Sequence, residues 1–431
     1  MVTPPRHASP ALLQSADALN KGCFCRTLDA DILRRILESD PDLAGLLQTL
    51  QVTRPNLFSS TAVFLSREKF ELMQAGVAAI ERVIRLPAYQ TLTLARAPSI
   101  AQLAFGPLGV FMSYDFHLGP ERPKLIEINT NAGGALLNAA LAGAQKACCE
   151  AMNWAFAAEQ DPHSREQIFM AMFLQEWRLQ RGEGGPGRLL VIDDDPKSQY
   201  LAAEFELFRL MFGRHGIASQ VADPAELAWH DGALWHQGTR VDMVYNRLTD
   251  FYLSAPRHAA LRSAYEAGAV VLTPHPRTHA LHADKRNLVT LSDEKLLGHW
   301  GVSSTDRELL KSIVPRSWPV AADNADAMWS RRRELFFKPA GGFGAKAAYR
   351  GDKLTRRVWG EILAGTYIAQ TLVPPTERLI EVDGVLTSLK FDVRAYTYDG
   401  QIQLLAARMY AGQTTNFRTL GGGFAPVIVV S

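Results

Sequence analysis

The sequence predicts a mixed α/β protein that combines a parallel-sheet domain with a mostly antiparallel region. At 431 residues the chain exceeds what one ordinary hydrophobic core organises, which indicates two or three domains. Residues 188–275 alternate short apolar runs with helical patterns, as parallel sheets with flanking helices do. The last hundred residues contain successive strand patterns with turns between them, which favour an antiparallel sheet.

Composition excludes several classes of protein. The chain is 47% hydrophobic and 21% charged with a net charge of +2, which is typical of a soluble globular protein without a nucleic-acid or membrane-surface field. It has no apolar run of about 20 residues and no secretory signal pattern at its start. The four cysteines stand in close pairs, at Cys23, Cys25, Cys148 and Cys149. We interpret them as ordinary thiols of a cytoplasmic protein.

The first half of the chain predicts helices followed by a hairpin. The first sixty residues have a helical pattern with weak boundaries, and a clearer helix follows Ser66 and ends before Pro87. Two strands are expected in "LGVFMSYDFHL" and "PKLIEINT", joined by the turn "GPERP". A long Ala-rich helix is expected over 135–160, and a second helix before the linker "RGEGGPG" at 181–187.

The second half begins with the α/β pattern and ends with strands. Strands are expected at 188–192, 217–222, 241–247 and 269–274, with an amphipathic helix over 198–216 and a helical crossover near 275–300. Further strands are expected at 334–340, 347–351, 366–373, 389–400 and 401–412.

Two polar segments in this half have competing interpretations. The acidic run 193–195 resembles the pocket of a response-regulator receiver domain, but the strand that should carry the phosphoacceptor ends in Asn246 and Arg247. Helix N-caps are the better explanation of these acids. Arg247 is either a structural arginine or a clamp for a substrate carboxylate at the end of a strand. The histidines at 275, 279 and 282 have the spacing of a zinc site, which the flanking Pro274 and Pro276 argue against.

The predicted hairpin at 108–130 carries a candidate cation site. Asp115 and Glu127 are expected on neighbouring strands, and Glu127 and Asn129 share a face because strand side chains alternate. Two carboxylates and an amide oxygen suit Mg²⁺, which commonly takes one or two carboxylates together with phosphates and water. Solvated acids on a plain hairpin are the alternative.

Elements of a nucleotide site occur far along the chain. "FFKPAGGFGAK" places Lys338 at the end of a strand and then Gly341, Gly342 and Gly344, which suits phosphate binding but is not a P-loop pattern. Lys285 begins a helix, and the strand that includes Gln370, Thr371, Leu372 and Val373 is a candidate adenine partner. Asp392, Arg394, Arg408, Asn416, Arg418 and a glycine run at 421–423, expected as a lid, complete the set.

Together, "IEINTNAGG", "KPAGGFGAK", "YIAQTLVPP" and "FDVRAY" resemble the ATP-grasp superfamily. The metal motif comes first, which is similar to the circularly permuted group of eukaryotic-type glutathione synthetases and glutathionylspermidine synthetases. The resemblance implies a permuted ATP-grasp fold plus a parallel-sheet substrate domain. The expected parts are an N-terminal helical region at 1–105, the metal-binding part with long helices at 106–182, a substrate domain at 188–275 and a nucleotide-binding region at 276–431.

The resemblance also implies roles for individual residues. Asp115, Glu127 and Asn129 would bind Mg²⁺. Lys285 and Lys338 would contact the ATP phosphates under a loop formed by Gly341, Gly342 and Gly344, and Gln370, Thr371, Leu372 and Val373 would form the adenine hinge. Arg408 and Lys338 would act on the transferred phosphate. Arg247 would lie in the substrate cleft, and we expect the turn with Asn131, Gly133 and Gly134 to face the substrate.

The implied activity is an ATP- and Mg²⁺-dependent ligation of a carboxylate to an amine through an acyl phosphate. Amino-acid or peptide-like substrates and a homodimer are expected on the same grounds. Ser113 stands where these families commonly have arginine, which leaves the glutathione substrate open. A small-molecule kinase and a non-catalytic nucleotide-binding module are the alternatives.

Overall fold

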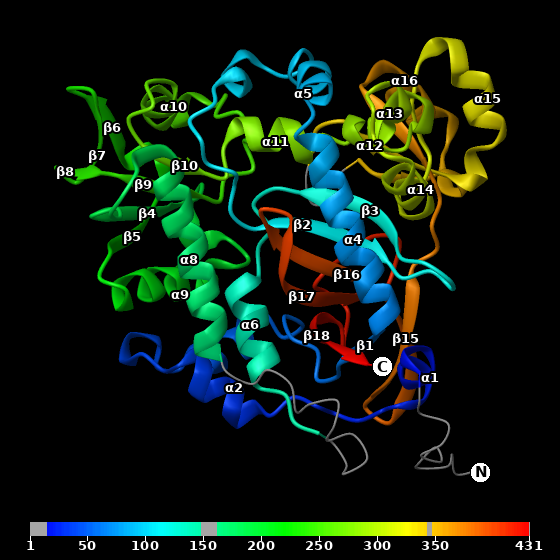
Figure 1. The fold of residues 1–431 in the computed structure, drawn as a ribbon. Coiled ribbons are helices and arrows are strands. Elements are labelled where there is room, and N and C mark those ends of the chain that lie inside the picture. Colours follow the sequence, from blue (N-terminus) through cyan, green and yellow to red (C-terminus); the bar gives the residue numbers. More distant parts are fainter. Residues whose placement is uncertain (1–14, 148–161, 343–346, 431) are drawn as a thin grey trace.

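A seven-stranded sheet forms the centre of the molecule (Figure 1). The computed structural model describes residues 15–147, 162–342 and 347–430. Its main strands follow the order β1-β18-β17-β16-β2-β3, and β15 pairs with β16. All pairs are antiparallel except β1 with β18. The strands are β1 (Val63–Ser66), β2 (Met112–His117), β3 (Lys124–Asn129), β15 (Thr376–Val382), β16 (Val385–Tyr398), β17 (Gln401–Tyr410) and β18 (Gly423–Val430).

One face of this sheet packs against the long helix α4 (Arg67–Ile84), which crosses it in Figure 1. Ser66 caps the helix by accepting a hydrogen bond from the Lys69 amide, as the predicted start of this helix requires. The N-terminal region also contains α1 (Ala16–Gly22), α2 (Ala30–Leu37), α3 (Leu46–Thr53) and α5 (Pro87–Leu94). It contributes β1 to the central sheet as well, so it is not purely helical.

The predicted parallel sheet is confirmed, in the order β10-β9-β4-β5. Its strands are β4 (Arg188–Ile192), β5 (Ala218–Ala222), β9 (Met243–Asn246) and β10 (Val271–Thr273). Helices α8 (Pro162–Arg181) and α9 (Ala202–Arg214) cover one face, and α10 (Ala259–Glu266) packs on the other. The sequence-based prediction missed the small antiparallel sheet β6 (Leu227–His230), β7 (Ala233–His236) and β8 (Thr239–Val241).

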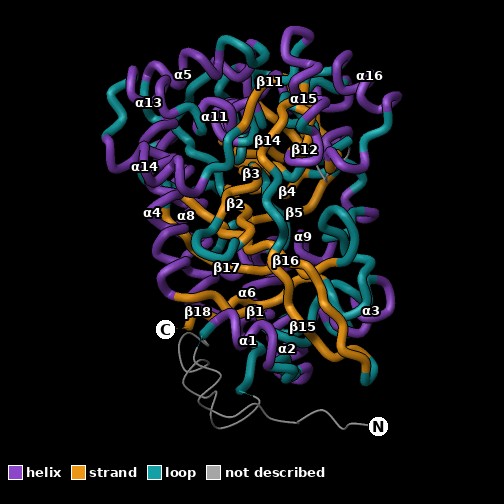
Figure 2. Tube along the Cα trace, turned by 90° about the vertical axis from the view of Figure 1, so that its right-hand side faces the viewer, coloured by secondary structure: helices purple, strands orange, loops and turns teal. Residues whose placement is uncertain are grey.

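The antiparallel strands of the last hundred residues divide between two sheets. The second is four-stranded, in the order β11-β14-β12-β13, and Figure 2 shows it at the end of the molecule remote from the chain ends. It contains β11 (Ser317–Pro319), β12 (Leu335–Pro339), β13 (Tyr349–Arg350) and β14 (Tyr367–Thr371). Nearby helices are α11 (Pro276–His282), α12 (Arg286–Leu291), α13 (Glu294–His299), α14 (Ser304–Ile313), α15 (Ala325–Ser330) and α16 (Arg356–Ala364).

The expected Ala-rich helix is shorter than predicted within the described chain. Helix α6 (Ala135–Gly143) begins after Gly134, whose positive φ of 96° suits the turn that leads into it. The rest of the predicted segment falls largely at 148–161, outside the described residues. None of the helices that the structure describes is long and apolar enough to cross a membrane.

Candidate active site

A cleft lies between the central sheet and the four-stranded sheet. It encloses about 780 Å³, the open space at its mouth included. β3 and β17 contribute one wall, and β12 and β14 contribute the other. The polar lining residues are His117, Glu127, Lys285, Lys338, Gln370, Thr371, Arg408, Tyr410, Gln413, Thr414 and Thr415.

Two lysines that are distant in sequence converge on this cleft. The Nζ of Lys338, on β12, donates to the Gln370 Oε1 at 2.9 Å and to the Ile126 carbonyl. The Nζ of Lys285 donates to the Gly342 carbonyl at 2.9 Å and lies 3.1 Å from Glu127 Oε1. Burial lowers the pKa of Lys338 to about 8, although the Glu127 charge opposes the shift. The cleft therefore holds a cation that is costly to keep charged until an anion arrives.

The predicted hairpin brings Asp115, Glu127 and Asn129 together. Asp115 on β2 stands opposite Glu127 on β3, and Asn129 Nδ2 donates to Asp115 Oδ2 at 3.1 Å. The Glu127 side chain is 28% exposed towards the cleft, whereas Asp115 is fully buried. Burial alone would raise the pKa of Glu127, but Lys285 and Lys338 lower it below its usual value.

Both carboxylate oxygens of Asp115 accept hydrogen bonds from arginines. Arg394 on β16 donates to both carboxylate oxygens at 2.9 and 2.8 Å, and Arg408 on β17 donates to Oδ2 at 2.8 Å. Burial would raise the pKa of Asp115, but these two guanidinium groups lower it to about 2. Arg408 Nε also donates to the buried Asp392 at 2.7 Å. Asp115 and Asp392 thus fix the direction in which Arg408 enters the cleft.

The three predicted Mg²⁺ ligands differ in whether their oxygens are available to a metal ion. Glu127 reaches the cleft and suits the single-carboxylate mode in which phosphates and water complete the Mg²⁺ shell. Asp115 has no oxygen that is free of an arginine, and Asn129 is oriented by its bond to Asp115. No group of three or more His, Cys, Asp or Glu side chains that could hold a metal ion occurs within the described ranges. Metal binding by these three residues stays a prediction, and the geometry favours Glu127.

The three histidines with the spacing of a zinc site do not form one. Their ring nitrogens bond to separate partners: His275 to the Pro107 carbonyl, His279 to Thr130, and His282 to the Thr278 carbonyl. All three lie in the described part of the chain, where no metal-binding group of side chains is found. The zinc alternative is therefore wrong.

Only a few hydrogen-bonding groups of the predicted adenine hinge are available to a ligand. The amides of Thr371 and Leu372 donate to the carbonyls of Arg316 and Glu334, so they are not available to a ligand. The Val373 carbonyl contacts His117 Nδ1 at 3.0 Å. In the described part of the chain, no partner is seen for the Val373 N–H, and the buried Nε2 of Gln370 is also unpaired. A ligand with acceptor atoms at this edge would satisfy both groups.

The two glycine segments differ in role. Open space surrounds the position that a Cβ would take on Gly341, and Gly342 has a φ of 135° and accepts a hydrogen bond from Lys285 through its carbonyl. Phosphate binding by this loop stays a prediction. Gly344 lies outside the described residues. The predicted lid at 421–423 is wrong: a Cβ on Gly423 would lie 2.3 Å from the Asn56 carbonyl, so these glycines permit close packing. The preceding residues Gln413, Thr414 and Thr415 line the cleft instead.

The predicted substrate residues form a second cluster, at the carboxyl end of β9. The Arg247 Nη1 donates to the Tyr245 hydroxyl at 2.8 Å, and a Cβ on Gly133 would lie 2.6 Å from Arg247 Nη2. The Nδ2 of Asn131 donates to the Leu248 carbonyl at 3.2 Å. The Arg247 Nε and the Asn131 Oδ1 are both buried and have no hydrogen-bond partner among the described residues. This cluster therefore keeps one buried donor and one buried acceptor unsatisfied within the described residues.

Sequence reasoning missed Glu204, which connects Arg247 to the turn before α6 in this cluster. It is fully buried on α9, accepts hydrogen bonds from the amides of Gly134 and Leu136, and lies 3.6 Å from Arg247 Nη2. Burial raises the pKa of Glu204 above its usual value, although Arg247 opposes the shift. A carboxylate on the apolar side of a predicted amphipathic helix was the one signal in the sequence.

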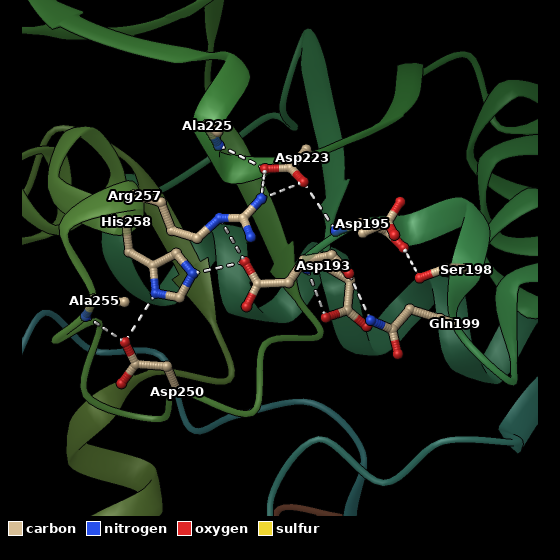
Figure 3. A network of polar contacts seen from close by, with 11 residues as sticks. Asp193, Asp195, Ser198, Gln199, Asp223, Ala225, Asp250, Ala255, Arg257 and His258 are labelled. Carbon is tan, nitrogen blue, oxygen red and sulfur yellow. Dashed lines mark hydrogen bonds and ion pairs between the residues drawn. The ribbon is translucent and has the colours of Figure 1, made fainter.

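The acidic run 193–195 belongs to a network of charges with four later residues, Asp223, Asp250, Arg257 and His258 (Figure 3). His258 bridges Asp194 and Asp250, with both ring nitrogens 2.9 Å from a carboxylate oxygen. Arg257 donates to Asp223 and lies 3.2 Å from Asp194. Asp195 precedes a short 3₁₀ helix, but its side chain makes no capping hydrogen bond. Asp194 therefore ties the loops at this sheet edge together through its side chain, and Asp195 does so through its N–H, which donates to Asp223. Among the described residues, Asp193 accepts only from the Asp194 amide, and none of the three serves as the predicted helix cap.

No protein-family model matches the chain, and no curated protein matches its sequence. Among solved structures, a glutathione synthetase-like effector from Globodera pallida in its apo form matches with a TM-score of 0.54 and 12% identity, over 93% of this chain and 98% of that one. A putative gamma-glutamylcysteine synthetase from Methylobacillus flagellatus matches at 0.45 and 10%, over 83% and 86%. An ATP-grasp ligase complexed with a minimal precursor matches at 0.29 and 14%, over 56% and 89%.

The likeness to the effector is one of fold. The permuted order of the segments stays a prediction. By the likeness along almost the whole chain, this protein has an ATP-grasp fold.

Proposed function

We propose that this protein is an ATP- and Mg²⁺-dependent carboxylate–amine ligase. The observation that supports this best is the cleft in which Lys285, Lys338 and Arg408 surround the partly exposed Glu127. Three cations and one accessible carboxylate suit a triphosphate with its metal ion. The remaining lining suits ATP, because the Gln370 Nε2 and the Val373 N–H are unpaired donors that could bond to acceptor atoms of the base.

Within this proposal, the chain's own groups bind and neutralise charge. Lys285, which is paired with Glu127, would contact a phosphate oxygen, and Glu127 would then be available to hold Mg²⁺ together with phosphates and water. Bound Mg²⁺ supplies neutralisation of charge on the phosphates. Arg408, fixed by Asp115 and Asp392, and Lys338 stabilise the charge that develops as the substrate carboxylate attacks the γ-phosphoryl group.

The resulting acyl phosphate would react with the amine, forming the amide and releasing phosphate. No enzyme nucleophile is needed for this sequence. The corner around Arg247, Asn131 and Gly133 supplies a free guanidinium N–H and a free amide oxygen for the substrate. One donor and one acceptor suit an amino-acid or peptide-like compound, whose carboxylate and N–H groups complement them.

The proposal is tested by incubating the protein with Mg-ATP and pools of amino acids, short peptides and polyamines. A ligase releases ADP and phosphate only when an acid and an amine are both present, and mass spectrometry finds a condensation product. A product that retains the phosphoryl group would identify a kinase. Nucleotide binding without ADP release in any pool would identify a non-catalytic module. Glu127→Gln serves as the matched inactive variant.

A further inference from the structure

His117, at the end of β2, is a cleft residue to which the proposed reaction assigns no role. It lines the cleft described above and is 8% exposed. The preceding residue pairs with Val393 on β16, so His117 lies beside Asp392. Asp392 in turn pairs with Arg408 on β17. The sheet therefore places His117 close to the groups that fix Arg408 in the cleft.

One hydrogen bond determines which ring nitrogen of His117 carries a hydrogen. Nδ1 lies 3.0 Å from the Val373 carbonyl oxygen, which can only accept, so Nδ1 is the donor. Burial lowers the pKa of His117 below its ordinary value of 6.5, although the charge of Asp392 opposes the shift, so the ring is neutral at pH 7.5. In a neutral ring whose Nδ1 is protonated, Nε2 is a hydrogen-bond acceptor.

The Nε2 of His117 is available to a ligand. Within the described ranges no hydrogen bond involves it, and it is not one of the buried side-chain atoms that lack a partner, so it is reached from the cleft. The carboxylate of Asp392 already accepts from Arg408 and Thr415. Most of the other polar groups named above are donors: Lys285, Lys338, Arg408, the Gln370 Nε2 and the Val373 N–H. His117 thus adds a neutral acceptor to a lining that otherwise suits phosphates and ring nitrogens.

ATP has few groups that could donate to such an acceptor. Its phosphate oxygens and the free ring nitrogens of adenine accept hydrogen bonds, whereas its donors are the exocyclic amine of the base and the ribose hydroxyls. With the base at the hinge and the phosphates at the cations, the sugar lies between them because it links the two covalently. His117 has the same intermediate position, since it contacts the hinge at Val373 and lies beside Asp392, next to Arg408.

We propose that His117 is a specificity-determining residue that recognises the sugar of the nucleotide, with its Nε2 accepting a hydrogen bond from a ribose hydroxyl. This inference rests on the proposed function, because it requires ATP in the cleft. The bond from Nδ1 to the Val373 carbonyl holds the ring and so fixes the direction of the acceptor. A nucleotide that lacks the hydroxyl leaves Nε2 covered by the sugar and without a partner, which lowers affinity.

The experiment measures equilibrium binding by titration calorimetry at about pH 7.5, with Mg²⁺ and without acid or amine substrates. ATP, 2′-deoxy-ATP, 3′-deoxy-ATP and inosine triphosphate, which lacks the base amine, are titrated into the native protein. We expect at least one deoxy analogue to bind about fivefold more weakly than ATP, the usual effect of one hydrogen bond between neutral groups. Equal affinities for ATP and both deoxy analogues would overturn this inference alone. Absence of ATP binding would overturn the proposed function as well.

Variants assign the preference to His117. His117→Phe keeps a ring and removes both nitrogens, so it should bind ATP about fivefold more weakly than the native protein and should bind ATP and the deoxy analogues equally. His230→Phe is the matched control, because His230 is more than half exposed on β6 and does not line the cleft, and it should keep the native preference.

Two results with His117→Phe would overturn the inference. Weaker binding of every nucleotide with the native preference retained would mean that His117 acts only by holding the Val373 carbonyl. Loss of the discrimination between ATP and inosine triphosphate, with the preference over the deoxy analogues retained, would mean that Nε2 accepts from the base amine and not from the sugar.

Discussion

Replacing Asp115 by Asn tests whether this carboxylate serves to hold arginines or to bind metal. The substitution leaves Arg394 and Arg408 buried without their common anion. The pKa of about 2, lowered from 3.8, corresponds to roughly 2–3 kcal/mol of stability at pH 7, and breaking a buried pair typically costs about 3–5 kcal/mol. We therefore expect a loss of about 3 kcal/mol. Because the folded pKa is the lower one, this contribution is complete above about pH 4 and is lost as the pH falls towards 2.

Thermal unfolding measures the effect. With about 2.1 cal/mol/K of unfolding entropy per residue, 3 kcal/mol corresponds to a fall of about 3 °C for a chain of this length that unfolds as one unit. Asp399→Asn is the matched control, because its partner Arg85 and Asp399 itself are both more than half exposed, and such pairs contribute less than about 1 kcal/mol. If Asp115→Asn has the same melting temperature as the Asp399→Asn control but requires much more Mg²⁺ for turnover, the assignment of Asp115 to the arginines is refuted.

Three further predictions concern the cleft and the substrate corner. Glu127→Gln should reduce ATP turnover by at least about a hundredfold in steady-state assays with little change in melting temperature, and full activity would refute the metal assignment. ATP affinity should fall as the pH rises above about 8, because Lys338 loses its proton there, and a titration of Lys338→Met should show weak, pH-independent binding. Gly133→Ala should raise the KM of the acid or amine without weakening ATP binding, since the added methyl displaces Arg247. Gly360→Ala, on α16 with open space at its Cβ, should be neutral in the same kinetic assays, and the opposite ranking would contradict this geometry.

Local rules were sufficient for parts of the structure with strong periodicity. The capped helix at Ser66 and the strand at 188–192 formed as predicted, because each depends on neighbouring residues. The hairpin placed Asp115 beside Glu127 for the same reason, since alternation and a short turn fix which side chains share a face. The sequence also identified both lysines of the cleft through a Gly-rich strand end and a helix start.

Tertiary structure decided what the charged groups do. β16 and β17 come almost three hundred residues after β2, so only the assembled sheet could show that arginines occupy Asp115. Glu204 acquires its role through the amides of Gly134 and Leu136, 70 and 68 residues away, and Gly423 acquires its role by packing against Asn56 and Leu57. The sequence by itself determined which residues could carry charge and turn, and where helices and strands begin. Burial and long-range neighbours, which set whether a charge is free, paired or neutralised, were fixed only by the fold.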